Sequence, residues 1–403
     1  MLLSSTINHI IANGRLDIVD VAGKCTTFGS GVNPNFVVRL HSRGAALRIA
    51  TNPQLAIGES YMTGDLTVEG GSLYDFLLFM AENFAESGPS KFMKLRDICG
   101  FLMRRFMQRN AGWRSRSNVA PHYDLTAELY DLFLYADKQY SCAYFVGKTD
   151  SLERAQERKK RHIAAKLCLS PNLQVLDIGS GWGGLALYLA REQGVTVKGL
   201  TLSKEQLNAA VSRASTMGMS GRVQFALKDY REETGEYDRI VSIGMFEHVG
   251  VPFYGSYFQT ISDRLAPEGV ALVHTIGRTT GPGVTNPFIR KYIFPGGYIP
   301  AISEVFPAIE QAGLIVTDIE VLRLHYAKTL KAWRERFRKN WSNVSNLYSE
   351  EFCRMWEFYL AASEVAFRAQ GLVVWQIQIA KNQDSVPLIR DYITDYDRCI
   401  DNH

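Results

Sequence analysis

A short apolar run, a glycine-rich turn and a helical pattern follow one another near the middle of the chain. Residues 175–178 are apolar except for Asp177, which suits a buried strand of a parallel sheet. A helical pattern then begins at Leu185 and continues to residue 190. Strand, turn and helix predict the opening unit of a Rossmann-type sheet, in which glycine lets the backbone approach a ligand closely. The turn has glycine at every second position: Gly179, Gly181 and Gly183.

Two classes of cofactor are bound by such a turn. Gly179, Gly181 and Gly184 also fit the dinucleotide pattern, which calls for an acidic residue at the end of the second strand. The second predicted strand, residues 195–202, lacks one, and the nearest acid, Glu205, falls inside the next helix. The Asp-x-Gly-x-Gly-x-Gly form that starts at Asp177 is typical of S-adenosylmethionine methyltransferases. A glycine-rich connection with no ligand is the alternative, and the spacing favours the methyl donor.

Further apolar runs extend the pattern to a sheet of seven strands, at residues 222–226, 238–243, 269–274, 314–322 and 372–380. The predicted fold class is therefore α/β, a seven-stranded Rossmann-like methyltransferase sheet with aromatic-rich helical insertions and a small N-terminal lobe. Ligands bind at the carboxyl ends of parallel strands, so one crevice is expected to collect the polar residues there. Those residues are Asp177, Thr201, Asp229, Glu247 and His274.

The remaining sequence predicts three parts. Residues 1–86 mix strand-like runs with a helical pattern and suggest a small N-terminal lobe with its own core. Residues 87–118 form a basic amphipathic linker, in which Lys and Arg alternate with large apolar residues and a single acid, Asp97. Such a helix either lies on anionic lipid or packs on the protein, and its apolar share disfavours nucleic acid. Residues 119–403 form the predicted catalytic domain.

Two long helical patterns late in the chain, residues 329–341 and 349–370, are rich in Trp, Phe and Tyr. Aromatic helices inserted over the crevice would suit a long apolar substrate. The same spacing is also typical of ordinary core packing, and the sequence leaves both interpretations open.

Composition limits the class of protein and the cellular compartment that the sequence predicts. The chain has 403 residues, enough for two domains, and its hydrophobic and charged shares of 46% and 21% are those of a globular protein. No stretch approaches the length of a membrane span, and the first residues do not resemble a signal peptide. The cysteines are scattered, without zinc-like spacing, so no metal site is expected. A cytoplasmic protein that meets membranes from one side fits best.

Several further motifs lie along the predicted catalytic domain. They begin with Gln-Tyr-Ser-Cys-Ala-Tyr at residues 139–144, before the glycine turn, and continue with Gly-Met-Phe-Glu-His-Val-Gly at 244–250, His-Thr-Ile-Gly at 274–277 and His-Tyr at 325–326. Together these motifs resemble those of the cyclopropane-fatty-acyl-phospholipid synthases and the related mycolic-acid methyltransferases. The likeness covers at least residues 119–380, and the extra N-terminal lobe favours the branch that acts on phospholipids.

The resemblance implies transfer of a methylene group from S-adenosylmethionine to a cis double bond of an unsaturated phospholipid acyl chain. It implies peripheral contact with the inner face of the membrane, a homodimer, and a bicarbonate ion that takes up the released proton. The residues at the bicarbonate positions are Cys142, Glu247, His274, the backbone of Ile276, and Tyr326. A nucleophilic role for Cys142 is disfavoured, because alkene methylation contains no acyl-transfer step.

The resemblance also assigns the cofactor-binding residues. The amino-acid part is assigned to Tyr140, Ser141, Asp177, Gly179, Gly181 and Gly183, the ribose to Thr201, Leu202, Ser203 and Gln206, and the adenine to Asp229, Tyr230 and Arg231. Two positions depart from the family pattern: Ser180 replaces a cysteine, and Ala127 replaces an asparagine near the entrance loop. The second change leaves a methyl-branched or hydroxylated product open, as well as a lipid-binding relative without catalysis.

Overall fold

The computed structural model describes residues 7–8, 10–31, 33–87 and 125–401. The chain forms two compact units. The first contains the described N-terminal residues together with Val284–Pro295 and Leu330–Leu372, and the second contains the seven-stranded sheet. The predicted boundaries at residues 86 and 118 adjoin or enter the stretch outside the described residues, which also holds the basic linker, so these domain limits stay predictions. Among the described helices, none has both the length and the apolar character needed to cross a bilayer.

The second unit is built on the sheet that the apolar runs predict. Its strand order is β10-β11-β9-β8-β5-β6-β7, with parallel pairing from β9 through β7 and an antiparallel β10–β11 pair at one edge. The predicted α/β fold class is therefore confirmed. The strands are β5 (Gln174–Ile178), β6 (Thr196–Thr201), β7 (Val223–Leu227), β8 (Tyr237–Ile243), β9 (Leu265–Arg278), β10 (Ile315–Leu322) and β11 (Leu372–Ala380).

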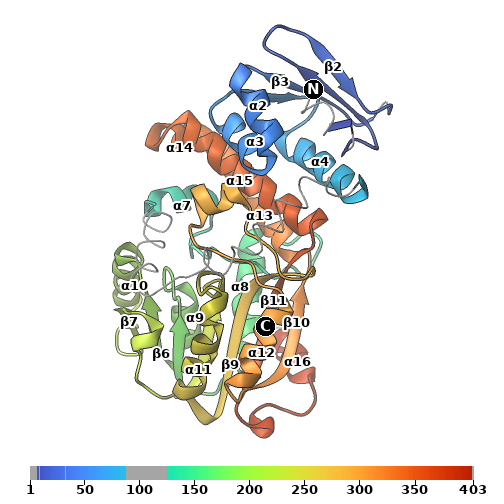
Figure 1. The fold of residues 1–403 in the computed structure, drawn as a ribbon. Helices are drawn as coiled ribbons and strands as arrows, with labels where there is room; N and C mark the ends of the chain where they lie inside the picture. Colours follow the sequence, from blue (N-terminus) through green and yellow to red (C-terminus); the bar gives the residue numbers. More distant parts are fainter. Residues whose placement is uncertain (1–6, 9, 32, 88–124, 402–403) are drawn as a thin grey trace. The chain divides into compact units, whose positions relative to one another are not determined.

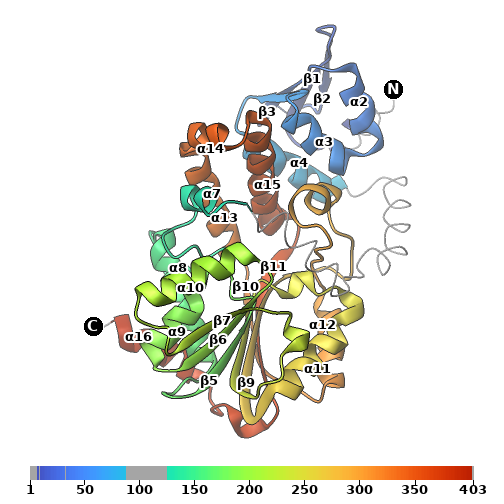
Figure 2. The same ribbon diagram turned by 90° about the vertical axis from the view of Figure 1, so that its left-hand side faces the viewer.

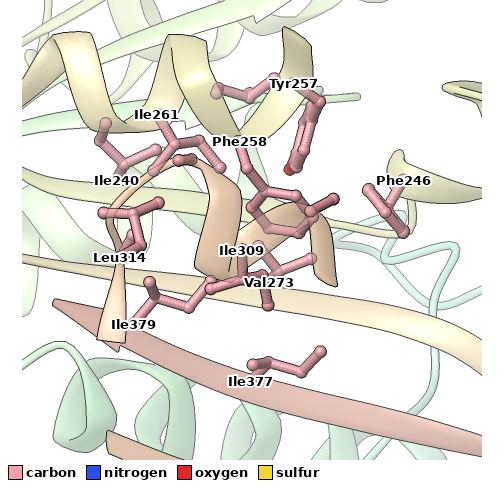
Figure 3. Packing of buried hydrophobic residues seen from close by; sticks show 14 of the residues in the cluster. Ile240, Phe246, Tyr257, Phe258, Ile261, Val273, Ile309, Leu314, Ile377 and Ile379 are labelled. Carbon is pink, nitrogen blue, oxygen red and sulfur yellow. The ribbon is translucent and has the colours of Figure 1, made fainter. Parts of the chain in front are cut away.

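Helices cover both faces of this sheet (Figure 2). One face carries α8 (Leu152–Lys166), α9 (Gly184–Gln193), α10 (Lys204–Thr216) and α16 (Asp391–Asp401), and the other carries α11 (Tyr254–Arg264) and α12 (Ile302–Gln311). Figure 3 shows Phe258 and Ile261 of α11 above Val273 of β9 and Ile377 of β11, and all four belong to one buried apolar cluster. Burial on both faces explains why these strands are continuous apolar runs.

The first unit has its own sheet and core (Figure 1). Its strand order is β2-β1-β3-β4, and Phe36 of β3 packs on Phe76 and Phe79. The elements are β1 (Arg15–Val19), β2 (Cys25–Phe28), β3 (Asn35–Leu40), β4 (Leu66–Glu69), α2 (Arg43–Thr51), α3 (Pro53–Met62) and α4 (Leu73–Ser87).

The aromatic helices of the late chain pack into this first unit. The helix α15 (Glu350–Ala369) lies against α3 and α4, beside α14 (Trp341–Leu347) and the end of α13 (His325–Lys339). Trp333 and Trp356 are fully buried. Core packing, one of the two interpretations left open by the sequence, therefore accounts for these two side chains.

Candidate active site

A cavity lies at the carboxyl ends of β5, β6 and β8 in the second unit. It is lined by the glycine turn, by the ends of the three strands and by the loop before α8. The lining includes most of the residues that the sequence assigns to the cofactor: Tyr140, Ser141, Asp177, Gly179, Gly181, Thr201, Leu202, Gln206, Asp229, Tyr230 and Arg231. Gly183 and Ser203 are not part of this lining.

The glycines of the turn have different tasks. Gly179 and Gly181 line the cavity with φ values of +89° and +52°, and the space next to Gly181 is open. Gly183, with a φ of +80°, is the residue before α9, and a Cβ there would lie 2.7 Å from the ring of Phe225. Left-handed backbone and this close approach both demand glycine at residue 183, so a packing role explains it without a ligand.

Asp177 presents an unsatisfied carboxylate oxygen in this region. The residue is 2% exposed, and its Oδ2 has no hydrogen-bond partner among the residues that the structure describes. Burial raises the pKa of Asp177 to about 7, an effect that the nearby charge of Lys159 opposes. Because a buried acceptor without a partner is costly, Asp177 is well placed to receive a donor from a ligand.

The second and third strand ends carry side chains that are already held in place. Gln206 Oε1 accepts a hydrogen bond from Thr201 Oγ1 at 2.8 Å. Ser203 instead caps α10, where its Oγ accepts the backbone N–H of Gln206 at 3.3 Å. After β7, Arg231 donates to both carboxylate oxygens of Asp229, with distances of 2.8 and 2.6 Å. These hydrogen bonds hold the side chains of the polar rim of the cavity, Thr201, Gln206, Asp229 and Arg231, in fixed positions.

Glu247 is a buried acid next to cavity-lining residues in the sequence. It follows β8 in the short helix η2 (Phe246–His248), between Met245 and His248, which line the cavity. Its Oε1 accepts the backbone N–H of Ile276 at 2.6 Å, whereas its Oε2 is buried and has no hydrogen-bond partner within the described part of the chain. Burial raises the pKa of Glu247 to about 7. The structure thus joins two of the sequence-predicted catalytic residues, Glu247 and Ile276.

His274 lies on β9, two residues before Ile276. Its Nδ1 is 3.2 Å from the side-chain amide nitrogen of Gln376, and burial lowers the pKa of His274 well below its ordinary value. With the amide placed in this way, Nδ1 accepts and Nε2 carries the proton. His274 is therefore a neutral donor.

The segments that carry Cys142 and Tyr326 are joined by a hydrogen bond between neighbouring residues. The Ala143 backbone N–H donates to Thr329 Oγ1 at 3.0 Å, and Thr329 lies one turn after Tyr326 on α13. Cys142 is fully buried, and burial raises the pKa of its thiol. A thiol that stays protonated is a poor nucleophile, which agrees with the prediction that Cys142 does not act as one. None of the five predicted catalytic residues lines the cavity itself; Cys142 and Glu247 adjoin lining residues in sequence.

Lys159 belongs to this region although the sequence did not single it out. It lies on α8, is fully buried, and its Nζ donates to Gln139 Oε1 at 2.6 Å and to Ser141 Oγ at 2.9 Å. The sequence does contain an indication that this lysine is buried. Lys159 shares the helix face of Leu152, Ala155 and Ile163, and this apolar face predicts a buried position.

Two family models match separate parts of the chain. Residues 111–377 match the family described as mycolic acid cyclopropane synthetase, and residues 10–87 match a domain of unknown function. The cyclopropane-fatty-acyl-phospholipid synthase of Escherichia coli K12 is 36% identical over 353 residues, which cover 88% of this chain and 87% of that protein. The tuberculostearic acid methyltransferase UfaA1 of Mycobacterium tuberculosis is 35% identical over 344 residues, which cover 82% and 80%.

Solved structures give the same family. The cyclopropane synthase MmaA2 from Mycobacterium tuberculosis has a TM-score of 0.64 and 34% identity, covering 66% of this chain and 98% of its own. The mycolic acid cyclopropane synthase CmaA1, complexed with SAH and CTAB, has a TM-score of 0.63 at 34% identity, covering 66% and 97%. With the site and the matches in agreement, the chain belongs to the mycolic acid cyclopropane synthetase family.

Proposed function

We propose that this protein transfers a methylene group from S-adenosylmethionine to a cis double bond of an unsaturated phospholipid acyl chain and so forms a cyclopropane ring. The likeness to the E. coli phospholipid synthase supports this proposal, because it extends over 88% of this chain. The observation that carries it is the buried Glu247 carboxylate, which has one oxygen on the Ile276 amide and the other without a partner. That acid adjoins a cavity suited to the cofactor.

The proposed reaction balances without an oxidant or a reductant. The π electrons of the alkene attack the methyl carbon, a carbon–carbon bond forms, the carbon–sulfur bond breaks, and positive charge appears on the acyl chain. Loss of one proton from the new methyl group then closes the ring. The site must therefore hold the reactants in line, exclude water and accept one proton.

We infer that Glu247, together with Cys142, His274 and Tyr326, holds a small anion as that proton acceptor, and the family resemblance makes it bicarbonate. A bound bicarbonate would supply a weak base that does not trap the carbon cation permanently. Glu247 Oε2 would accept from its hydroxyl, while the Nε2–H of His274 and the hydroxyl of Tyr326 would donate. Ile276 differs from the expectation in one respect, because its N–H is already given to Glu247, and its carbonyl already accepts a hydrogen bond from Thr275 Oγ1.

Cofactor binding would use the polar rim described above. Asp177 Oδ2 would accept from the amino group of the cofactor, and the open backbone of Gly181 would let the amino-acid part approach. Thr201 and Gln206 would bind the ribose. Asp229 and Arg231 would lie near the adenine.

Lipid analysis tests the function directly. Cells that express the protein should gain lipids heavier by one CH₂ per modified chain, and Glu247→Gln should lose nearly all of this product. Methyl-labelled S-adenosylmethionine should place its label in lipid. A protein that binds lipid but transfers no label would be the non-catalytic relative instead.

A second product deserves a separate measurement, since one relative is named a tuberculostearic acid methyltransferase. A saturated methyl-branched chain contains two more hydrogens than the cyclopropane and needs a reductant, so mass spectrometry distinguishes the two. Ala127, whose backbone N–H donates to Glu205 at 3.0 Å, is the departure from the family pattern that leaves the product open.

We further propose that the protein meets its substrate at the membrane surface, through the basic segment 87–118, and that it forms a homodimer. Sedimentation with vesicles should show stronger binding to anionic than to neutral lipid. Equal binding to both kinds of vesicle would contradict a role for the basic segment in membrane binding. Light scattering measures the mass of the assembly.

A further inference from the structure

A buried lysine holds the loop that forms one wall of the cavity. Lys159 Nζ donates to the side chains of Gln139 and Ser141, and both of these residues line the cavity. The neighbouring Gln156 donates to the Ser141 carbonyl at 2.9 Å, and the Tyr144 N–H donates to the Ala155 carbonyl at 3.0 Å. The helix α8 thus fixes the loop at several points.

The ammonium group also acts on the reaction site electrostatically. Lys159 Nζ donates to the hydroxyl of Ser141, the residue before Cys142, and its charge opposes the rise in pKa that burial imposes on the Asp177 carboxyl and on the Cys142 thiol. It adds to the lowering of the His274 pKa, of which burial is the main cause. Cys142 and His274 are two of the proposed ligands of the anion, and both are neutral. A buried anion needs a compensating positive charge, because removing an unpaired ion from water costs several kcal/mol.

We propose that Lys159 is a positioning residue whose buried ammonium group provides the positive charge that stabilises bicarbonate beside His274 and Cys142. This inference rests on the proposed function, because the anion is that of the proposed reaction. The two hydrogen bonds of Lys159 set the loop, and its charge acts through space on the bound anion.

The acid–base behaviour of Lys159 agrees with such a role. Burial lowers the pKa of Lys159 to about 7, and the neighbouring ammonium of Lys160 lowers it further. A nearby bound anion must raise this pKa, and by linkage the charged lysine must strengthen the binding of the anion. Lysine and bicarbonate therefore stabilise each other.

Three variants separate charge from hydrogen bonding. Lys159→Gln keeps an N–H donor and removes the charge, whereas Lys159→Arg keeps a cation. Lys160→Met is the matched control, because it removes a buried ammonium one position along α8 whose partners are Asp137 and Glu157 instead of Gln139 and Ser141. Each protein is titrated with NaH¹³CO₃ and followed by its rise in melting temperature and by the ¹³C line width, with NaCl as the ionic-strength control.

We expect Lys159→Gln to bind bicarbonate about tenfold more weakly than wild type, as loss of a charge-assisted contact implies. Lys159→Arg should retain more of the affinity, and Lys160→Met should not weaken it. Equal bicarbonate affinity in wild type and Lys159→Gln would overturn the inference and leave the proposed function intact. Failure of the wild type to bind bicarbonate or to modify lipid would instead count against the proposed function.

If Lys159→Gln does not fold, the inference is tested on the wild-type protein. Protein labelled with ¹³C at the lysine ε position is titrated with bicarbonate and then with acid. The inference requires the pKa of one lysine to rise when bicarbonate is present. No change in any lysine would refute it.

Discussion

Glu247→Gln should make the protein more stable and nearly inactive at the same time. In the wild type, the Glu247 carboxylate is buried, one oxygen has no partner, and the residue lies beside the cavity. Glutamine has almost the same shape and can still accept the Ile276 N–H with its Oε1. The substitution therefore removes a buried ionisable group while it preserves the packing.

The magnitude follows from the shift of the Glu247 pKa from 4.5 to about 7. At about 1.4 kcal/mol per pKa unit, ionised Glu247 lowers the free energy of unfolding by about 3 kcal/mol. Because the pKa is higher in the folded protein, that folded state binds more protons between pH 4.5 and 7, and stability falls as the pH rises through this window. Above pH 7 the whole cost is present, and below pH 4.5 it vanishes.

Urea unfolding at several pH values measures this difference. At pH 8 Glu247→Gln should exceed wild type in stability, and the gap should close towards pH 4.5. Glu310→Gln, an exposed substitution on α12, is the control and should show no comparable pH-dependent gap. Equal or lower stability of Glu247→Gln at pH 8 would refute the reasoning about burial, and retained lipid modification would refute the assignment of Glu247 to the reaction.

Three further outcomes are expected. Gly183→Ala should destabilise the protein by about 1–2 kcal/mol or more in chemical denaturation, because a left-handed backbone and the ring of Phe225 both oppose a Cβ. Ile261→Ala should cost about 2–5 kcal/mol by the same measurement, since Ile261 is fully buried between α11 and the sheet (Figure 3). Iodoacetamide at pH 8 should label exposed Cys25 in the native protein and spare buried Cys142, as mass spectrometry of digests can show; rapid labelling of Cys142 would contradict the raised pKa of its thiol.

The sheet could be predicted from the sequence because its strands are buried on both faces. Such strands are continuous apolar runs, and the run at residues 372–380 coincides with β11. The crevice followed from topology alone, since parallel strands place their carboxyl ends at one edge. That is how Asp177 and Thr201, distant in sequence from Asp229, could be assigned to one cavity.

Other features depend on tertiary contacts that a local pattern does not contain. The side chain of Ser203 suits a ligand and a helix cap equally well in sequence, and the structure uses it as a cap. The burial of Lys159 is weakly indicated in the sequence, because its helix is rich in charge although Leu152, Ala155 and Ile163 share its face. The aromatic face of α15 is compatible with a substrate channel or with a core, and only its packing on α3 and α4 distinguishes them.

Asp177, Glu247 and Lys159 are three of the buried ionisable groups in the proposed site, and burial disfavours the charged form of each. Counted with sulfonium and bicarbonate, these three groups leave an excess of one negative charge, since the cavity-lining cations Lys138, Lys228 and Arg231 each pair with a carboxylate. Without Lys159 that excess would be two negative charges, and burial of the anion would cost more free energy. An excess of one is useful, because the positive charge that leaves sulfur for the acyl chain remains inside a negative environment throughout the reaction.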